Sequence, residues 1–220
     1  YLVTGSYDSE LSKTYSLNTE TNEWTFLSTM PTPRHGFELV FYGHRIWAIG
    51  GFGSGSISNV VESYDIENNS WRTEASLDVG RNWASSWTAN NTLYVAGGRH
   101  EGGEFLDSII AFNPSISSWV SAGNLPEIKQ GSDARILGDE VYIVAGATGV
   151  STPSNKVFAA DLNASVEGVY DLYVKTGDAS TGTPTVQAEV ADGSIGPSKL
   201  SSEVSNALKP VLVGQPRSVV

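Results

Sequence analysis

The stretch RIWAIGG at residues 45–51, followed by VESYD at residues 61–65 and SW at residues 70–71, decides the fold of this chain of 220 residues. An apolar run that ends in two glycines is typical of a short strand buried on both faces, which leads into a turn that needs positive φ. The same order returns later, as TLYVAGG at residues 92–98, SIIAFN at residues 108–113 and SW at residues 118–119. One structural unit is therefore copied along the sequence.

Three kinds of marker recur at an interval of about 48 residues. The tryptophans are Trp24, Trp71 and Trp119. The glycine markers are Gly50-Gly51, Gly97-Gly98 and Gly146-Ala147, so that Ala147 replaces the second glycine in the last unit. The ring markers are Tyr15, Tyr64, Phe112 and Phe158. A unit of this length cannot bury its apolar face alone, so each unit has to pack on its neighbours.

Each complete unit holds four short runs rich in Val, Ile, Tyr, Phe and Trp, separated by turn-forming pairs such as Asn90-Asn91 and Gly138-Asp139. Four antiparallel strands in successive units of equal length describe the blades of a β-propeller. Residues 1–162 hold one partial unit, two full units and another partial unit. We therefore predict an all-β fold, an incomplete propeller of about three to four four-stranded blades, and expect further blades before Tyr1, because closed propellers typically have about four to eight.

The pattern of glycine pair, Tyr-Asp, tryptophan and Pro-x-x-Arg resembles the kelch repeat. The residues that carry the resemblance are Gly50-Gly51, Tyr64-Asp65 and Trp71 in one unit, Gly97-Gly98, Phe112-Asn113 and Trp119 in the next, and the linking motifs Met30-Pro31-Thr32-Pro33-Arg34 and Leu125-Pro126. The resemblance covers residues 1–162. It implies a kelch-type propeller in which the repeated glycines and aromatic residues, Gly146 included, are structural, and it implies no particular activity.

The bulk composition restricts the possible partners. The formal net charge is −11 and there is no cysteine. An acidic surface repels phosphates, so we expect no nucleic-acid partner. The sequence contains no stretch of eighteen apolar residues, so we expect no membrane insertion. Cysteine-based disulfides, zinc sites and nucleophiles are excluded.

The composition changes after residue 162. Residues 163–194 are expected to form a last strand, at residues 169–174, and a flexible linker rich in Gly, Ser and Thr. Residues 195–220 are expected to hold a short amphipathic helix between Pro197 and Pro210, followed by a tail. This segment is similar to stalk-like segments of bacterial surface proteins and phage fibres, which favours self-association through residues 195–210, whereas a disordered spacer is the alternative.

Basic residues recur at matching positions and form the candidate site. Arg34, Arg81 and Lys129 are followed by His35, Asn82 and Gln130, and Arg99 and His100 come directly after a glycine pair. In kelch propellers such positions often lie on the ligand-binding face. A ring of cations around one rim would select a carboxylate or an acidic peptide. In the alternative, each cation pairs with a carboxylate or backbone group of a neighbouring blade.

The sequence predicts no catalytic residue, metal site or cofactor. His35, His44 and His100 lack the spacing of metal ligands, and no phosphate loop or nucleophile elbow occurs. We therefore expect a non-catalytic module that binds a protein or glycan, within a larger extracellular or cell-surface protein. The alternatives are a carbohydrate-active enzyme, for example one that acts on sialic acids, and a structural head on an oligomerising stalk.

Overall fold

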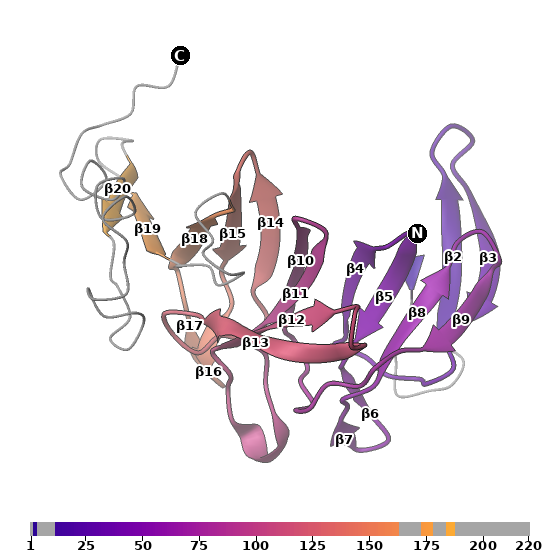
Figure 1. Cartoon of the computed structure of the whole chain (residues 1–220), viewed down its shortest axis with the longest axis horizontal. Coiled ribbons are helices and arrows are strands. Elements are labelled where there is room, and N and C mark those ends of the chain that lie inside the picture. Colours follow the sequence, from indigo (N-terminus) through magenta and orange to yellow (C-terminus); the bar gives the residue numbers. More distant parts are fainter. Residues whose placement is uncertain (1, 4–11, 163–172, 178–183, 188–220) are drawn as a thin grey trace.

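The computed structural model describes residues 2–3, 12–162, 173–177 and 184–187, and it is an array of antiparallel sheets (Figure 1). Blade 1 is the three-stranded sheet β1-β2-β3, with strands Leu2–Val3, Lys13–Asn18 and Glu23–Thr29. Blade 2 is β4-β5-β8-β9, with strands Glu38–Tyr42, Arg45–Ile49, Val61–Asp65 and Ser70–Thr73. Blade 3 is β10-β11-β12-β13, with strands Ser85–Ala89, Thr92–Ala96, Ser108–Asn113 and Ser118–Asn124.

Blade 4 contains five strands in the order β14-β15-β18-β19-β20. Their bounds are Asp133–Leu137, Glu140–Val144, Val157–Asp161, Tyr173–Gly177 and Pro184–Gln187. Strand β19 takes the place of the strand expected at residues 169–174, and β20 lies inside the segment expected to be a linker. The helix expected within residues 195–210 lies outside the described residues. In the described part of the chain, no helix is long and apolar enough to cross a bilayer.

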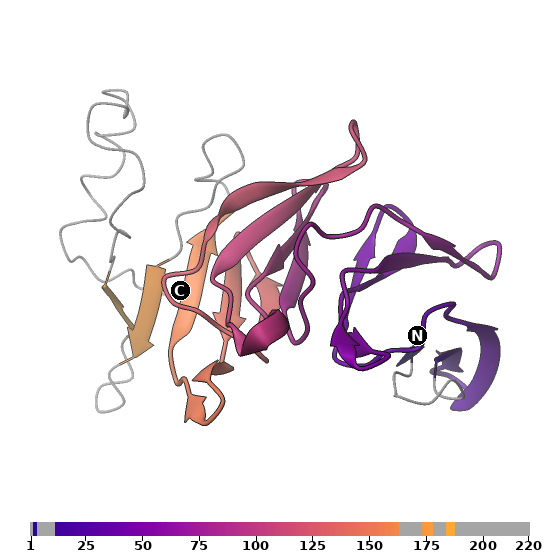
Figure 2. The ribbon, with the colours of Figure 1, turned by 90° about the horizontal axis from the view of Figure 1, so that it is seen from below.

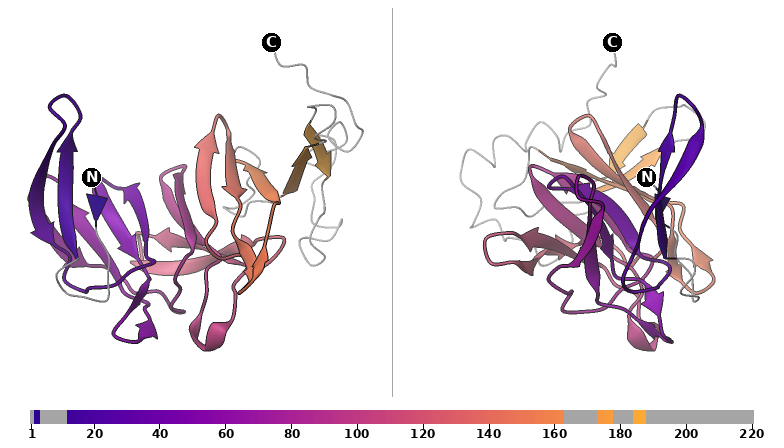
Figure 3. Two further views of the ribbon diagram at one scale, coloured as in Figure 1. Left: turned by 180° about the vertical axis from the view of Figure 1, so that it is seen from behind. Right: turned by 90° about the vertical axis from the view of Figure 1, so that its right-hand side faces the viewer.

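Two-residue turns set the register of the first hairpin in blades 2, 3 and 4. Gly43-His44 joins β4 to β5, and Asn90-Asn91 joins β10 to β11, with positive φ at all four residues. This is the geometry of the hairpin turns whose twist matches that of the flanking strands. The first strands of blades 2, 3 and 4 lie innermost, because β10 contacts both β4 and β14. The blades follow one another in chain order along the molecule (Figure 3).

The core lies between the blades rather than within any one of them. Trp47 and Ile49 of blade 2 pack with Leu93 and Phe112 of blade 3. A second cluster joins blades 3 and 4 through Trp87, Tyr94, Ala134, Ile143 and Phe158. Burial between sheets is thus what stabilises the array.

The repeated tryptophans tie each blade to the blade before it. Trp71 Nε1 donates to Thr14 Oγ1 at 3.0 Å, and Trp119 Nε1 donates to the carbonyl of Ala75 at 2.9 Å. Trp119 is 5% exposed, whereas Trp24 is 54% exposed. The difference follows from packing, because no described blade covers the matching face of blade 1.

The structure corrects the glycine register in blade 4. Gly146 (φ +85°) matches the second glycines Gly51 and Gly98, and Ala145 (φ +61°) occupies the position of the first glycine. A Cβ at Gly50 would lie 2.1 Å from the carbonyl oxygen of Arg81 in the next blade. Ala145 escapes this clash because no described blade follows blade 4, although its left-handed backbone costs about 1 kcal/mol.

Candidate functional site: the loop face and the axial groove

The loops between the second and third strands of blades 2, 3 and 4 all lie at one end of the array, the lower edge in Figure 1 and the side seen in Figure 2. They contain the β6–β7 hairpin (Phe52–Gly53 and Ser56–Ile57), the 3-10 turn η2 (Glu101–Gly103) and the β16–β17 hairpin (Ala147–Gly149 and Thr152–Pro153). The segments that connect successive blades, residues 33–37, 80–84 and 128–132, lie at the same end. We call this end the loop face. It contains all seven candidate residues: Arg34, His35, Arg81, Asn82, Arg99, His100 and Lys129.

The three linking cations lie inside the molecule. Arg34, Arg81 and Lys129 are 0%, 3% and 0% exposed. Arg34 donates to the carbonyl oxygens of Gly50 (2.7 Å) and Ala48 (3.0 Å) and forms an ion pair with the buried Glu62. Lys129 Nζ donates to the carbonyl oxygen of Ala145 at 2.8 Å. The cations are therefore engaged by carbonyl and carboxylate groups, as in the second alternative, but these groups belong to the cation's own blade and not to a neighbouring one.

Arg81 differs from Arg34 in its electrostatic environment. Its guanidinium donates to the carbonyl oxygens of Gly97 (3.1 Å) and Ser108 (3.2 Å). Ile110 of blade 3 occupies the position that Glu62 has in blade 2, so Arg81 has no carboxylate partner among the described residues. Desolvation by burial lowers the pKa of Arg81 to about 10. Burial also lowers the pKa of Arg34, which the Glu62 carboxylate partly offsets.

A series of backbone bridges follows the cations. Each bridge joins the residue after the cation to the residue after the second glycine, in the pairs His35–Phe52, Asn82–Arg99 and Gln130–Ala147. In the middle bridge the two N–H···O bonds measure 3.0 and 2.8 Å. Asn82 is buried, and its Oδ1 has no hydrogen-bond partner in the described part of the chain; the same holds for Arg99 Nε and Gln130 Oε1. His100 lies in the adjacent loop, where its Nδ1 is 3.0 Å from the carbonyl oxygen of Gly80.

Trp83 is the exposed aromatic residue that sequence reasoning missed on this face. It follows Asn82 at the position held by Gly36 in blade 2 and Gly131 in blade 4, and all three residues have φ between +52° and +63°. Its N–H donates to the carbonyl of Gly36 (2.8 Å), and its own carbonyl accepts from Gly131 N–H (2.7 Å). The side chain is 41% exposed. A left-handed backbone costs a residue other than glycine about 1–2 kcal/mol, so an exposed tryptophan here is a feature that folding alone does not favour.

A groove of about 400 Å³ lies where the innermost strands begin. We call it the axial groove. Its wall is formed by His35, Gly36, Phe37, Glu38, Leu39, Asp133 and Arg135, from blades 2 and 4. The indole of Trp83 rests against Gly36, where an added Cβ would lie 2.9 Å from Trp83 Nε1. The groove therefore combines two carboxylates, one guanidinium and apolar side chains beside an exposed indole.

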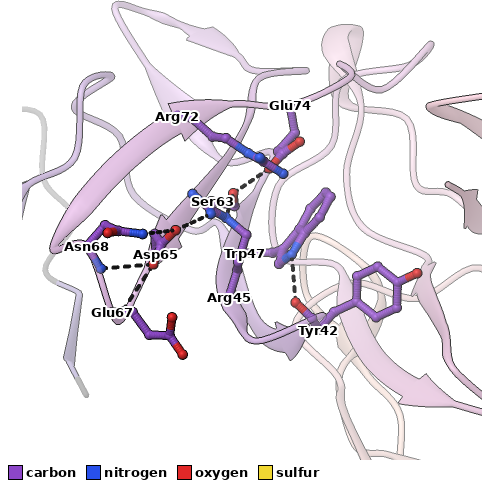
Figure 4. A network of polar contacts seen from close by, with 9 residues as sticks. All are labelled: Tyr42, Arg45, Trp47, Ser63, Asp65, Glu67, Asn68, Arg72 and Glu74. Atoms are coloured by element: carbon purple, nitrogen blue, oxygen red, sulfur yellow. Dashed lines mark hydrogen bonds and ion pairs between the residues drawn. The ribbon is translucent and has the colours of Figure 1, made fainter.

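The opposite edge of blade 2 holds a polar network with a structural function (Figure 4). Arg45 lies 2.6 Å from Asp65 and donates to Ser63 Oγ at 2.7 Å. Asp65 also accepts from the backbone N–H groups of Glu67 and Asn68, both at 3.0 Å. Hydrogen bonds from Asn68, together with Arg45, lower the pKa of Asp65 to about 2. The Asp of the Tyr-Asp motif thus closes a turn and lies far from the axial groove.

Comparison with known proteins agrees with this architecture. The family model described as the KLHDC2/KLHL20/DRC7 kelch-repeats domain matches residues 1–146. The chain therefore belongs to the kelch-repeat family. The solved structure described as that of YjhT superposes with a TM-score of 0.67 at 20% identity, over 78% of this chain and 61% of that chain.

Sequence relatives carry kelch names as well. Kelch-like protein 23 of Mus musculus is 31% identical over 115 residues, which are 52% of this chain and 20% of the relative. Kelch-like protein terF of Aspergillus terreus is 28% identical over 180 residues, which are 77% of this chain and 39% of the relative. Alpha-scruin of Limulus polyphemus is 23% identical, over 68% of this chain and 18% of its own length. The chain thus spans between 18% and 39% of the length of these curated relatives.

Proposed function

We propose that this chain is a non-catalytic interaction module that presents its loop face to a protein partner, as part of a larger secreted or cell-surface protein. Trp83 is the observation that carries the proposal. Its neighbours in the repeat, Gly36 and Gly131, adopt the same backbone without strain, so the indole is retained at an energetic cost. Exposed aromatic residues next to a polar groove are typical of the centres of protein interfaces.

A glycan is the second candidate ligand, and one observation favours it. The half-exposed indole of Trp83 offers a flat apolar ring beside the polar groups of the axial groove. A ligand with both apolar faces and hydroxyl groups would match this combination.

The proposal can be tested by panning a library of random peptides against the full chain, with a glycan array as a second arm. The test variant is Trp83→Gly, which restores the residue type of the two equivalent positions. We expect its thermal midpoint to stay within a few degrees of the parent, because relief of backbone strain offsets the added freedom of the unfolded chain. We expect bound peptides or glycans to lose at least tenfold in affinity, since central aromatic anchors typically contribute about 2 kcal/mol or more.

The matched control is Leu137→Ala, which removes an exposed apolar side chain at the opposite edge of blade 4. It should leave binding unchanged. Selected ligands that bind Trp83→Gly as well as the parent would contradict a loop-face site. Turnover of a sugar substrate would favour the enzymatic alternative instead.

A further inference from the structure

The carboxylate of Glu38 lies in the wall of the axial groove with little to compensate its charge. Among the described residues, its one hydrogen bond comes from Ser86 Oγ, at 3.2 Å, and it forms no ion pair. Glu62, the buried carboxylate of the same blade, pairs with Arg34 and also accepts from Thr32 Oγ1 at 2.8 Å. A partly buried carboxylate that lacks such partners gains most from a cation brought by a ligand.

The surrounding charges keep the groove acidic. Asp133 faces Glu38 from blade 4, and its like charge opposes ionisation of Glu38. Arg135 is the cation of the groove wall, but it is 75% exposed and its Nη1 is engaged 2.7 Å from Asp133. The imidazole of His35 completes the set of titratable groups in the wall. Burial of Glu38, with a further contribution from Asp133 and against the opposing effects of Ser86 and Arg135, raises its pKa to about 7.

The remaining wall is apolar and aromatic. Leu39 and Phe37 both line the groove, although the Phe37 ring also packs with Met30, Ala48 and Trp71, so that Leu39 is the more available apolar side chain. The indole of Trp83 packs on Gly36 at the same wall. Long basic side chains bury their methylene groups on such surfaces while the charged end meets a carboxylate, and an indole face attracts a cation.

We propose that the axial groove binds a lysine or arginine side chain of the protein partner, with its charge at Glu38 and Asp133 and its methylene groups against Leu39 and Trp83. This partner carries the opposite charge to the acidic peptide expected from the sequence. The linking cations that would attract an acidic peptide are buried, and the groove presents carboxylates instead. The proposal rests on the interaction function proposed above and specifies its chemistry.

The test uses the full chain and three blocked peptides, acetyl-Gly-Arg-Gly-amide, acetyl-Gly-Lys-Gly-amide and acetyl-Gly-Glu-Gly-amide. Binding is followed by the NMR signal of the Trp83 indole N–H, which is assigned through its loss in Trp83→Phe. We expect the two basic peptides to bind saturably and the acidic peptide not to bind. Affinity should be about tenfold higher at pH 8 than at pH 6, because a carboxylate that titrates near pH 7 is competent only when ionised.

Variants assign the effect to Glu38. Glu38→Gln should weaken the basic peptides about tenfold and remove most of the pH dependence, whereas Glu38→Asp, which keeps the charge, should retain both. His35→Gln should retain the pH dependence, and Arg135→Gln, which frees Asp133, should tighten binding. The matched control is Glu104→Gln, an exposed carboxylate of the loop face outside the groove, which should change nothing.

Three results would overturn the inference: equal binding of the acidic peptide, an unchanged affinity in a folded Glu38→Gln variant, or displacement of the peptides by magnesium or calcium at lower concentration. Panned peptides that bind the loop face but carry no basic residue would also overturn it while leaving the interaction function intact. Failure of every ligand to bind would instead count against the interaction function itself.

Discussion

The three linking cations occupy the same position in successive repeats and have the same structural role. They are Arg34, Arg81 and Lys129. Each lies in the connection that leads into its blade and donates to the carbonyl of the residue directly after the second strand of that blade. Buried carbonyls without a donor cost free energy, so a long cationic side chain is a stabilising choice at this position. In blade 2 the charge of Arg34 is also neutralised by Glu62, whereas the described part of the chain offers Arg81 only hydrogen bonds.

This difference predicts unequal costs of substitution. Glu62→Ala leaves the buried guanidinium of Arg34 without its counter-charge and should lower the free energy of unfolding by about 3–5 kcal/mol. Arg81→Ala leaves no described carboxylate without its counter-charge, so it should lower the free energy of unfolding by only about 1–3 kcal/mol. Thermal unfolding followed by tryptophan fluorescence measures both. Equal losses in the two variants would show that the ion pair contributes nothing beyond the hydrogen bonds.

Glu38 should make the stability of the fold depend on pH. The pKa of this carboxyl is raised from 4.5 to about 7, so the folded state binds the proton more tightly than the unfolded state does. Its stabilising effect is complete below about pH 4.5 and is lost as the pH rises through about 7. Glu38→Gln should therefore be more stable than the parent at pH 8, by about 1–3 kcal/mol. Parallel pH profiles of unfolding in the two proteins would contradict this.

At the scale of elements, the tryptophan in the last strand of a blade anchors that blade to its neighbour. Trp119 and Trp71 reach hydrogen-bond acceptors on the blade before them, and Trp24 has no described blade to reach. Trp119→Ala should therefore cost about 3–5 kcal/mol, as expected for a large buried side chain. Trp24→Ala should cost less than about 1 kcal/mol in the same chain. Similar losses at both positions would mean that the tryptophans stabilise their own sheets rather than the contacts between sheets.

Much of the element structure could be predicted from sequence. Alternation of apolar runs with Gly and Asn pairs located the hairpins, and the interval between tryptophans gave the blade repeat. The sequence pattern places the glycine register of blade 4 one position too far along, because Ala145 gives no composition signal and Gly146 then matches a first glycine. Strand β20 was missed because its residues, PTVQ, lie in a segment whose composition is typical of a linker.

The site was less predictable for a physical reason. The sequence predicts a ring of cations around one rim, whereas Arg34, Arg81 and Lys129 are buried. Whether a cation points to solvent or into the blade depends on carbonyls that only the folded strand ends bring together. The axial groove joins Glu38 to Asp133 and Arg135 across two blades, a juxtaposition that no local pattern contains. The sequence does contain a signal for Trp83. Gly36 and Gly131 occupy the equivalent position in the units before and after it, so a tryptophan stands where the repeat otherwise has glycine.

At the scale of the whole molecule, the array has two unlike ends. The upper edge is closed by tight turns and by the Arg45–Asp65 network. The loop face holds longer loops, an exposed indole and the axial groove. Loops on a rigid repeat scaffold can vary without disturbing the packing between blades, which is why such scaffolds support binding.

Hydrogen–deuterium exchange of the full chain, with and without a peptide selected by panning, tests this account most directly. The account predicts slower exchange in the connections at residues 33–37, 80–84 and 128–132 when the peptide is bound, and no change in the turns at residues 43–44, 90–91 and 138–139. Protection of those turns, with unchanged exchange on the loop face, would contradict it.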